Sequence, residues 1–184
     1  MISISNRGYL PACTELGRMY EAARNTDRAL AMYRATCLLG EHAACVSLGV
    51  LEEQLGKPSD AAGHYQRACG PESVLGCARL GSLYDRGAGV AGDPAKAFAL
   101  FDRACTSGDH AACFELAKLY RTGRGTPRDP VRALALYERA CEAKLAAACT
   151  EAGRLYSAIG RDAVAQQRFR KACQLGDSTA CGEP

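Results

Sequence analysis

The sequence predicts an all-α fold, a solenoid of about five helical hairpins stacked one after another. Three observations predict this fold class. Cysteines occur in pairs at one fixed spacing, the pairs recur at a longer period, and apolar residues within each period follow helical spacing. A period of about 20 to 50 residues is typical of stacked arrays, whose units bury their apolar faces against their neighbours.

The cysteines define the repeat. Ten of the eleven stand in C-x7-C pairs, and the eleventh, Cys13, has Ser5 where its partner would stand. Counted from Cys13, the second cysteines follow one another at intervals of 32 or 36 residues. We therefore predict one repeat domain over residues 1–184, with units at about 13–44, 45–76, 77–112, 113–148 and 149–180 and a partial cap at 181–184. The five pairs are Cys37 and Cys45, Cys69 and Cys77, Cys105 and Cys113, Cys141 and Cys149, and Cys173 and Cys181.

Each unit opens with a predicted helix, helix A, whose positions we count from the unit's first residue, a cysteine. Position 3 is Leu in four units, position 4 is Gly or Ala, and position 6 is Leu or Met. Apolar residues at positions 0, 3 and 7 lie on one face of a helix with about 3.6 residues per turn. The small residue at position 4 lets another helix approach closely, because glycine within a helix otherwise costs about 1 kcal/mol. Position 7 holds Tyr20, Glu52, Tyr84, Tyr120 and Tyr156.

A second predicted helix, helix B, precedes the first cysteine of each pair. An aromatic residue stands four residues before that cysteine, and an alanine stands eight residues before it. Spacings of four mark one helical face, so each unit is predicted to be a helical hairpin. The aromatic residues are Tyr33, Tyr65, Phe101, Tyr137 and Phe169.

The turns between helix A and helix B are of two lengths. Units three and four carry four extra residues, within Asp85–Pro94 and Arg121–Pro130. In both, an Asp-Pro pair suits the entry to helix B, with Asp as N-cap and Pro at the first helical position. Gly87–Gly92 matches the dinucleotide fingerprint G-x-G-x-x-G, which requires a preceding strand. Because a helix precedes it here, we interpret these glycines as part of the turn.

Composition and motifs narrow the classes of function. The chain is 48% hydrophobic and 23% charged, as folded proteins are, and its net charge of +3 comes without any run of Lys and Arg. This argues against binding to nucleic acid or a membrane surface mainly through charge. No stretch approaches the roughly 20 apolar residues of a membrane span. We find no motif of a known hydrolase and predict no catalytic residue, cofactor or metal.

Three sequence features resemble a known family. Helix A reads C-x-x-L-G-x-L-Y from Cys77, the turn reads G-x-G-V-x-x-D from Gly87, and helix B ends in R-A-C at Cys105. These resemble the Sel-one-like repeat, a relative of the tetratricopeptide repeat. The C-x7-C pairs look like its cysteine-rich, Hcp-type branch, which is β-lactamase-like. The resemblance implies a right-handed superhelix, with helix A lining a concave face.

The resemblance also implies a function. Family members are often adaptors in envelope or secretory processes, so we expect a scaffold that binds a protein or peptide in its groove. The alternative is a weak penicillin-binding protein or slow β-lactamase, with a β-lactam or peptidoglycan-related ligand. By analogy with the tetratricopeptide pattern, helix A positions 1, 5, 8 and 9 face the groove. Ordinary solvated helix residues remain the other interpretation of the charged candidates. The predicted partner-binding residues are Arg18, Val46, Val50, Arg86, Phe114, Lys118, Arg121 and Arg154.

The paired cysteines bear on the cellular compartment. If each unit is a hairpin, a pair joins the end of helix B to the start of the next helix A, within the about 4.4 to 6.8 Å between Cα atoms that a disulfide needs. Reduced, buried cysteines are the alternative, and zinc is disfavoured by the spacing. Disulfides predict an exported, periplasmic or otherwise oxidising location. The first residues, MISISNRGYLPAC, contain no signal-peptide core, so we expect an upstream part to be missing or export by another route. Cys13 is expected to be free.

Overall fold

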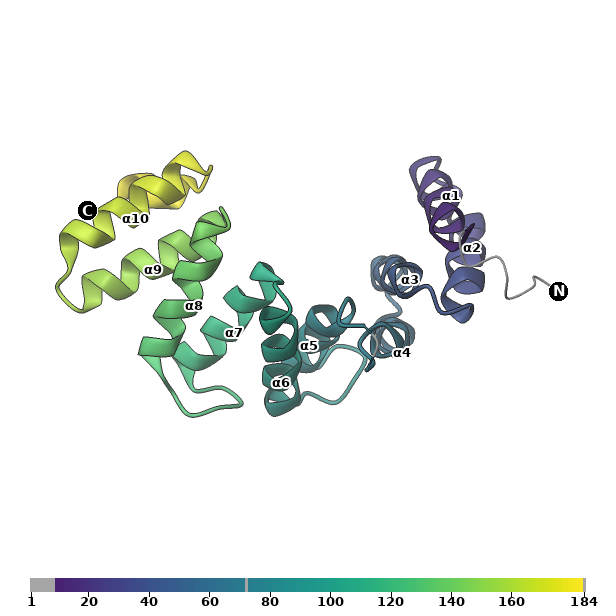
Figure 1. Cartoon of the computed structure of the whole chain (residues 1–184), viewed down its shortest axis with the longest axis horizontal. Helices are drawn as coiled ribbons and strands as arrows, with labels where there is room; N and C mark the ends of the chain where they lie inside the picture. Colours follow the sequence, from purple (N-terminus) through teal and green to yellow (C-terminus); the bar gives the residue numbers. More distant parts are fainter. Residues whose placement is uncertain (1–8, 72, 184) are drawn as a thin grey trace. The chain divides into compact units, whose positions relative to one another are not determined.

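The protein is all-α. The computed structural model describes residues 9–71 and 73–183, and these contain ten α-helices, one short 3-10 helix and no strand (Figure 1). Ser5, the counterpart of a first cysteine, lies outside the described residues. The helices are α1 (Leu10–Ala22), α2 (Thr26–Leu38), α3 (His42–Gln54), α4 (Pro58–Ala68), α5 (Cys77–Arg86), α6 (Pro94–Thr106), α7 (His110–Thr122), α8 (Pro130–Glu142), α9 (Ala146–Ala158) and α10 (Asp162–Gln174), followed by the 3-10 helix η2 (Ser178–Gly182).

The chain divides into two compact units, residues 1–93 and 94–184. In the first, α1 packs on α2 and α3 on α4 as hairpins, α2 packs on α3, and α5 packs on α4. In the second, α6 packs on α7, the pairs α7–α8 and α9–α10 form hairpins, and η2 packs on α10. Helix A therefore corresponds to the odd-numbered helices and helix B to the even-numbered ones. The prediction of one continuous domain stays a prediction.

The small residue at position 4 of helix A has a clear packing role. A Cβ atom at Gly49 would lie 2.5 Å from Cε1 of Tyr65, and one at Gly153 would lie 2.6 Å from Cε1 of Phe169. The ring of helix B thus lies directly on the backbone of helix A in the same hairpin. Tyr65 and Phe169 are buried, so the Gly and the aromatic residue form the centre of these two hairpins.

The turns end and begin helices as the sequence predicts. Gly123 has φ +72° and its N–H donates to the carbonyl of Leu119, which closes α7 with a left-handed residue. At the start of α8, the Asp129 carboxylate accepts hydrogen bonds from the backbone N–H groups of Val131 and Arg132. Gly87–Gly92 joins α5 to α6, so the fingerprint-like glycines belong to a turn between helices.

Candidate partner-binding face

Four disulfide bonds join one hairpin to the helix A that follows it, and a fifth joins α10 to η2. Their cysteines are those of the five C-x7-C pairs, and the Cα–Cα distances of 4.6 to 5.0 Å lie within the usual range. Each bond links the end of a helix B, or the residue that caps it, to the next helix A or to η2. Cys13 has a free thiol and is partly exposed. The disulfides fix the start of α3, α5, α7 and α9 relative to the preceding helix B, and thereby help to position the side chains of these A helices.

Position 8 of helix A reaches the aromatic residue of helix B. In the first compact unit, the Tyr65 hydroxyl donates to Glu53 Oε2 at 2.6 Å, and the Tyr33 hydroxyl donates to Glu21 Oε2 at 2.9 Å. Burial and the hydrogen bond to the neighbouring carboxylate raise the pKa of both tyrosines well above the ordinary value. In the second compact unit, the Tyr137 hydroxyl accepts a hydrogen bond from Arg121 Nε at 3.4 Å.

The five predicted basic residues are paired with acids of the same chain. Three of the pairs lie within one helix, because position 2 is Glu wherever position 5 is basic. Two others connect neighbouring A helices and leave the guanidinium groups about half exposed. The pairs are Arg18–Glu15, Arg86–Glu53 (3.0 Å), Lys118–Glu115 (2.6 Å), Arg121–Glu151 (3.7 Å) and Arg154–Glu151 (2.9 Å).

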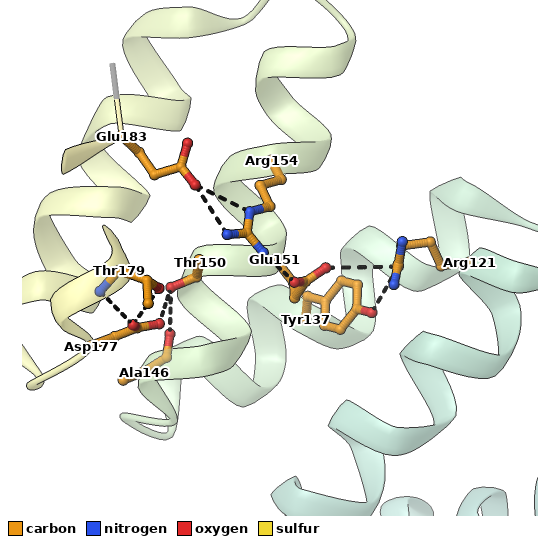
Figure 2. A network of polar contacts seen from close by, with 9 residues as sticks. All are labelled: Arg121, Tyr137, Ala146, Thr150, Glu151, Arg154, Asp177, Thr179 and Glu183. Carbon is orange, nitrogen blue, oxygen red and sulfur yellow. Dashed lines mark hydrogen bonds and ion pairs between the residues drawn. The ribbon is translucent and has the colours of Figure 1, made fainter. Parts of the chain in front are cut away.

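Figure 2 shows how these pairs extend into a network on α7, α9 and the C-terminal segment. Glu151 lies between Arg121 and Arg154, and the Arg154 guanidinium also donates from Nε and Nη2 to Glu183 Oε1, at 3.3 and 3.0 Å. These contacts with Glu183 and Glu151 raise the pKa of Arg154. A guanidinium in this position binds carboxylates, and here the chain itself supplies one from Glu183.

A second part of the network fixes η2 against α9. The Thr150 hydroxyl donates to Asp177 Oδ2 at 2.6 Å, and Asp177 also accepts from the hydroxyl and backbone N–H of Thr179 (Figure 2). The hydrogen bond from Thr150, followed by that from Thr179, lowers the pKa of Asp177. The C-terminal segment is therefore held where Glu183 reaches Arg154.

The apolar candidates lie in different surroundings. Phe114 is partly buried, with its ring 5.6 Å from that of Tyr137 and with Lys118 Nζ 5.5 Å from its centre. Val46 packs against the buried cluster that contains Tyr33, and Val50 is partly buried. The structure thus connects four predicted residues through Tyr137 and Glu151. We call Phe114, Lys118, Arg121 and Arg154 the α7–α9 face.

The sequence analysis did not predict the acidic residues that pair with these basic residues. Glu115 and Glu151 were detectable, because each stands three residues before a basic residue of the same helix. Glu183 gave no such signal, since it meets Arg154 across 29 residues. A further unpredicted group is Glu52, which occupies a tyrosine position and is buried within 3.3 Å of His64 Nε2 and 3.7 Å of Arg34.

The described residues hold no cluster of three or more potential metal ligands. Within residues 9–71 and 73–183, no helix combines the length and hydropathy that a bilayer-spanning segment needs.

Comparison with known proteins identifies the repeat. The Sel1 repeat family matches residues 74–109 and 110–145, and a tetratricopeptide repeat family matches residues 12–36. Two successive segments of the chain therefore match the Sel1 repeat, and a segment of the first hairpin matches the tetratricopeptide repeat. No protein of curated function matches it.

Solved structures show the same fold. A Sel1 repeat protein from Oxalobacter formigenes has a TM-score of 0.82 and 22% identity, over 93% of this chain and 75% of that one. YrrB, described as a TPR protein with an unusual peptide-binding site, has a TM-score of 0.59 and 20% identity, over 91% and 87%. Helicobacter pylori cysteine rich protein B matches at 26% identity over 86% and 93%, with a TM-score of 0.49, too low to support a conclusion. The first two show that the chain has the fold of repeat solenoids.

Proposed function

We propose that the protein is an interaction scaffold that binds a peptide or protein segment on the α7–α9 face. Sel1 and tetratricopeptide folds are typical of protein-interaction scaffolds, because a row of helices presents side chains fixed by the backbone to an extended partner. The observation that carries the proposal is the network itself. Arg121 and Arg154 point to one acid, Glu151, beside the partly exposed ring of Phe114.

The ion pairs within the α7–α9 face can be replaced by ion pairs with a partner. Exposed ion pairs contribute only about 0.2 to 1 kcal/mol, so a partner carboxylate replaces Glu183 on Arg154 at little cost. An apolar partner residue beside Phe114 then adds buried area, the larger source of affinity at interfaces. The expected partner segment therefore carries a carboxylate and an apolar anchor.

The disulfides support a proposal for the compartment. Five disulfide bonds are typical of proteins that mature in an oxidising environment. We propose an exported or periplasmic location, where an adaptor acts on envelope or secretory partners.

The experiment is a selection followed by matched variants. A random-peptide phage library is panned against the oxidised protein, and the affinity of the selected peptides is measured by calorimetry. Arg154→Ala and Phe114→Ala should each weaken binding about tenfold or more, with the helical circular dichroism of the folded protein retained. Arg170→Ala, an exposed arginine of α10 in the same compact unit, is the control and should bind as the wild type does. Peptides that bind all four proteins equally would place the interaction elsewhere.

The enzyme alternative has its own test. A chromogenic cephalosporin is incubated with the oxidised protein, and a scaffold gives no turnover above buffer. Turnover that survives purification to homogeneity would favour the β-lactamase alternative.

A further inference from the structure

Each inserted turn of units three and four packs on a specific proline of the preceding hairpin, which we call its seat. A Cβ atom at Gly89 would lie 2.3 Å from the carbonyl carbon of Pro58, and one at Gly125 would lie 2.1 Å from the carbonyl oxygen of Pro94. Each inserted turn therefore rests, backbone on backbone, on the proline that begins helix B of the preceding hairpin. Only glycine allows this approach, because any side chain would enter the proline's peptide group.

A third proline of this kind has no turn resting on it. Pro130 begins α8, and the following hairpin joins α9 to α10 through the short segment Ile159–Arg161, without the four extra residues. Pro130 is exposed, whereas Pro58 and Pro94 are half-buried. The seat that an inserted turn covers at the start of α4 and of α6 is thus open at the start of α8.

The open seat is a hollow with an apolar lining. Its volume is about 530 Å³, within the range of small-ligand pockets, and its wall includes Val131, Leu134, Leu155 and Ile159. Val131 is 76% exposed and Ile159 is 61% exposed. Exposed aliphatic groups that gather around one hollow are a feature of interaction sites. We call it the α8–α9 hollow.

Two arginines line the same hollow, Arg128 and Arg161. Arg128 Nε donates to the carbonyl of Arg121 at 3.2 Å. In the described part of the chain neither arginine has a carboxylate partner, in contrast to the paired arginines of the α7–α9 face. Their positive charge is available to an anionic group from outside.

We propose that the α8–α9 hollow binds a peptide segment in which an apolar side chain stands next to a carboxylate. The side chain enters among Val131, Leu134 and Ile159, and the carboxylate meets Arg128 or Arg161. The segment's backbone turns over Pro130, as the inserted turn at Gly125 does over Pro94. The carboxylate is either a chain terminus or an Asp or Glu side chain. This site shares no residue with the α7–α9 face, so the two proposals succeed or fail separately.

The test is an NMR titration of the ¹⁵N-labelled, oxidised protein with three peptides. The first is acetyl-Gly-Ser-Leu-Leu with a free C-terminus, the second is its C-terminal amide, and the third is the amide acetyl-Gly-Asp-Leu-Leu-NH₂. We expect the free acid, the Asp peptide or both to shift the amide signals of Val131 and Ile159 and to bind about tenfold tighter than the neutral amide. The two charged peptides distinguish a chain terminus from an acidic side chain.

Two variants complete the test. Arg161→Gln should reduce the affinity of the charged peptides toward that of the neutral amide, while Arg170→Gln should not. Replacing Ile159–Arg161 by the seven-residue turn Gly123–Asp129 should fill the seat and abolish binding, with the remaining amide signals retained. The proposal is overturned if no peptide binds at about 1 mM, if all three bind equally, if the shifts map away from the hollow, or if sedimentation shows that a second copy of the chain occupies it.

Discussion

At the scale of single residues, the hairpins depend on a ring lying on a glycine. Gly49→Ala should destabilise the protein by about 1 to 3 kcal/mol, because the new methyl group would lie 2.5 Å from Tyr65 Cε1 in a packed core. Gly63→Ala is the matched control. Gly63 also lies within a helix, but nothing stands within 4 Å of its Cβ position, so the change should stabilise by up to about 1 kcal/mol. Urea unfolding measures both, and equal effects would contradict this packing.

The buried tyrosines give a pH prediction. The pKa values of Tyr33 and Tyr65 are raised by burial and by their hydrogen bonds to Glu21 and Glu53. A tyrosine with a raised pKa in the folded state stabilises the fold fully below the unfolded-state pKa of about 10, and this contribution is lost as pH rises further. Stability should therefore be flat from neutral pH to about 9 and fall above 10.

The measurement is urea unfolding over this alkaline range, with tyrosinate absorbance recorded on the folded protein. Tyr65→Phe removes one such group and should shallow the alkaline fall. A variant with the wild-type slope would show that Tyr65 does not contribute to it.

At the scale of elements, α1 differs from the other A helices. Leu16 is 38% exposed and Met19 is 67% exposed, whereas their counterparts Leu48 and Leu51 of α3 are buried. These apolar side chains of α1 are thus more exposed than their counterparts in α3, and Cys13 forms no disulfide. Fewer buried contacts lower the free energy of local opening.

Hydrogen exchange tests this difference directly. Amides of α1 should exchange faster than those of α3 at the same pH, after correction for intrinsic rates. The comparison uses the oxidised protein, with α3 as the internal control in the same compact unit. Equal protection of the two helices would mean that the exposure of Leu16 and Met19 costs α1 no stability.

The helices and their pairing follow from the sequence because both are periodic. Leu48 and Leu51 recur at helical spacing, and Cys45 recurs at a fixed distance from Cys37, so local pattern and repeat length suffice. The seating of Gly125 on Pro94 was not predictable in this way. It joins a turn to a helix one repeat earlier, and only the three-dimensional packing shows that Pro130 has no such turn.

At the scale of the whole molecule, the sequence identified the basic side of the candidate face better than the acidic side. Lys118 and Arg154 were placed by repeat position, which depends on the helix alone. Glu183 reaches Arg154 because η2 folds back along α9 and α10, and this depends on the Thr150–Asp177 contact and the last disulfide. The repeat pattern does not identify the partner, because scaffolds of one fold bind different ligands.

The account depends most on the covalent junctions between hairpins, and intact-mass measurement under non-reducing conditions tests them most directly. The protein produced in an oxidising compartment should weigh ten hydrogens less than the reduced chain, with one alkylatable thiol at Cys13. Peptide mapping should link each first cysteine to the cysteine eight residues later. Eleven alkylatable thiols, or links between other cysteines, would contradict the disulfide-joined array and the compartment proposed from it.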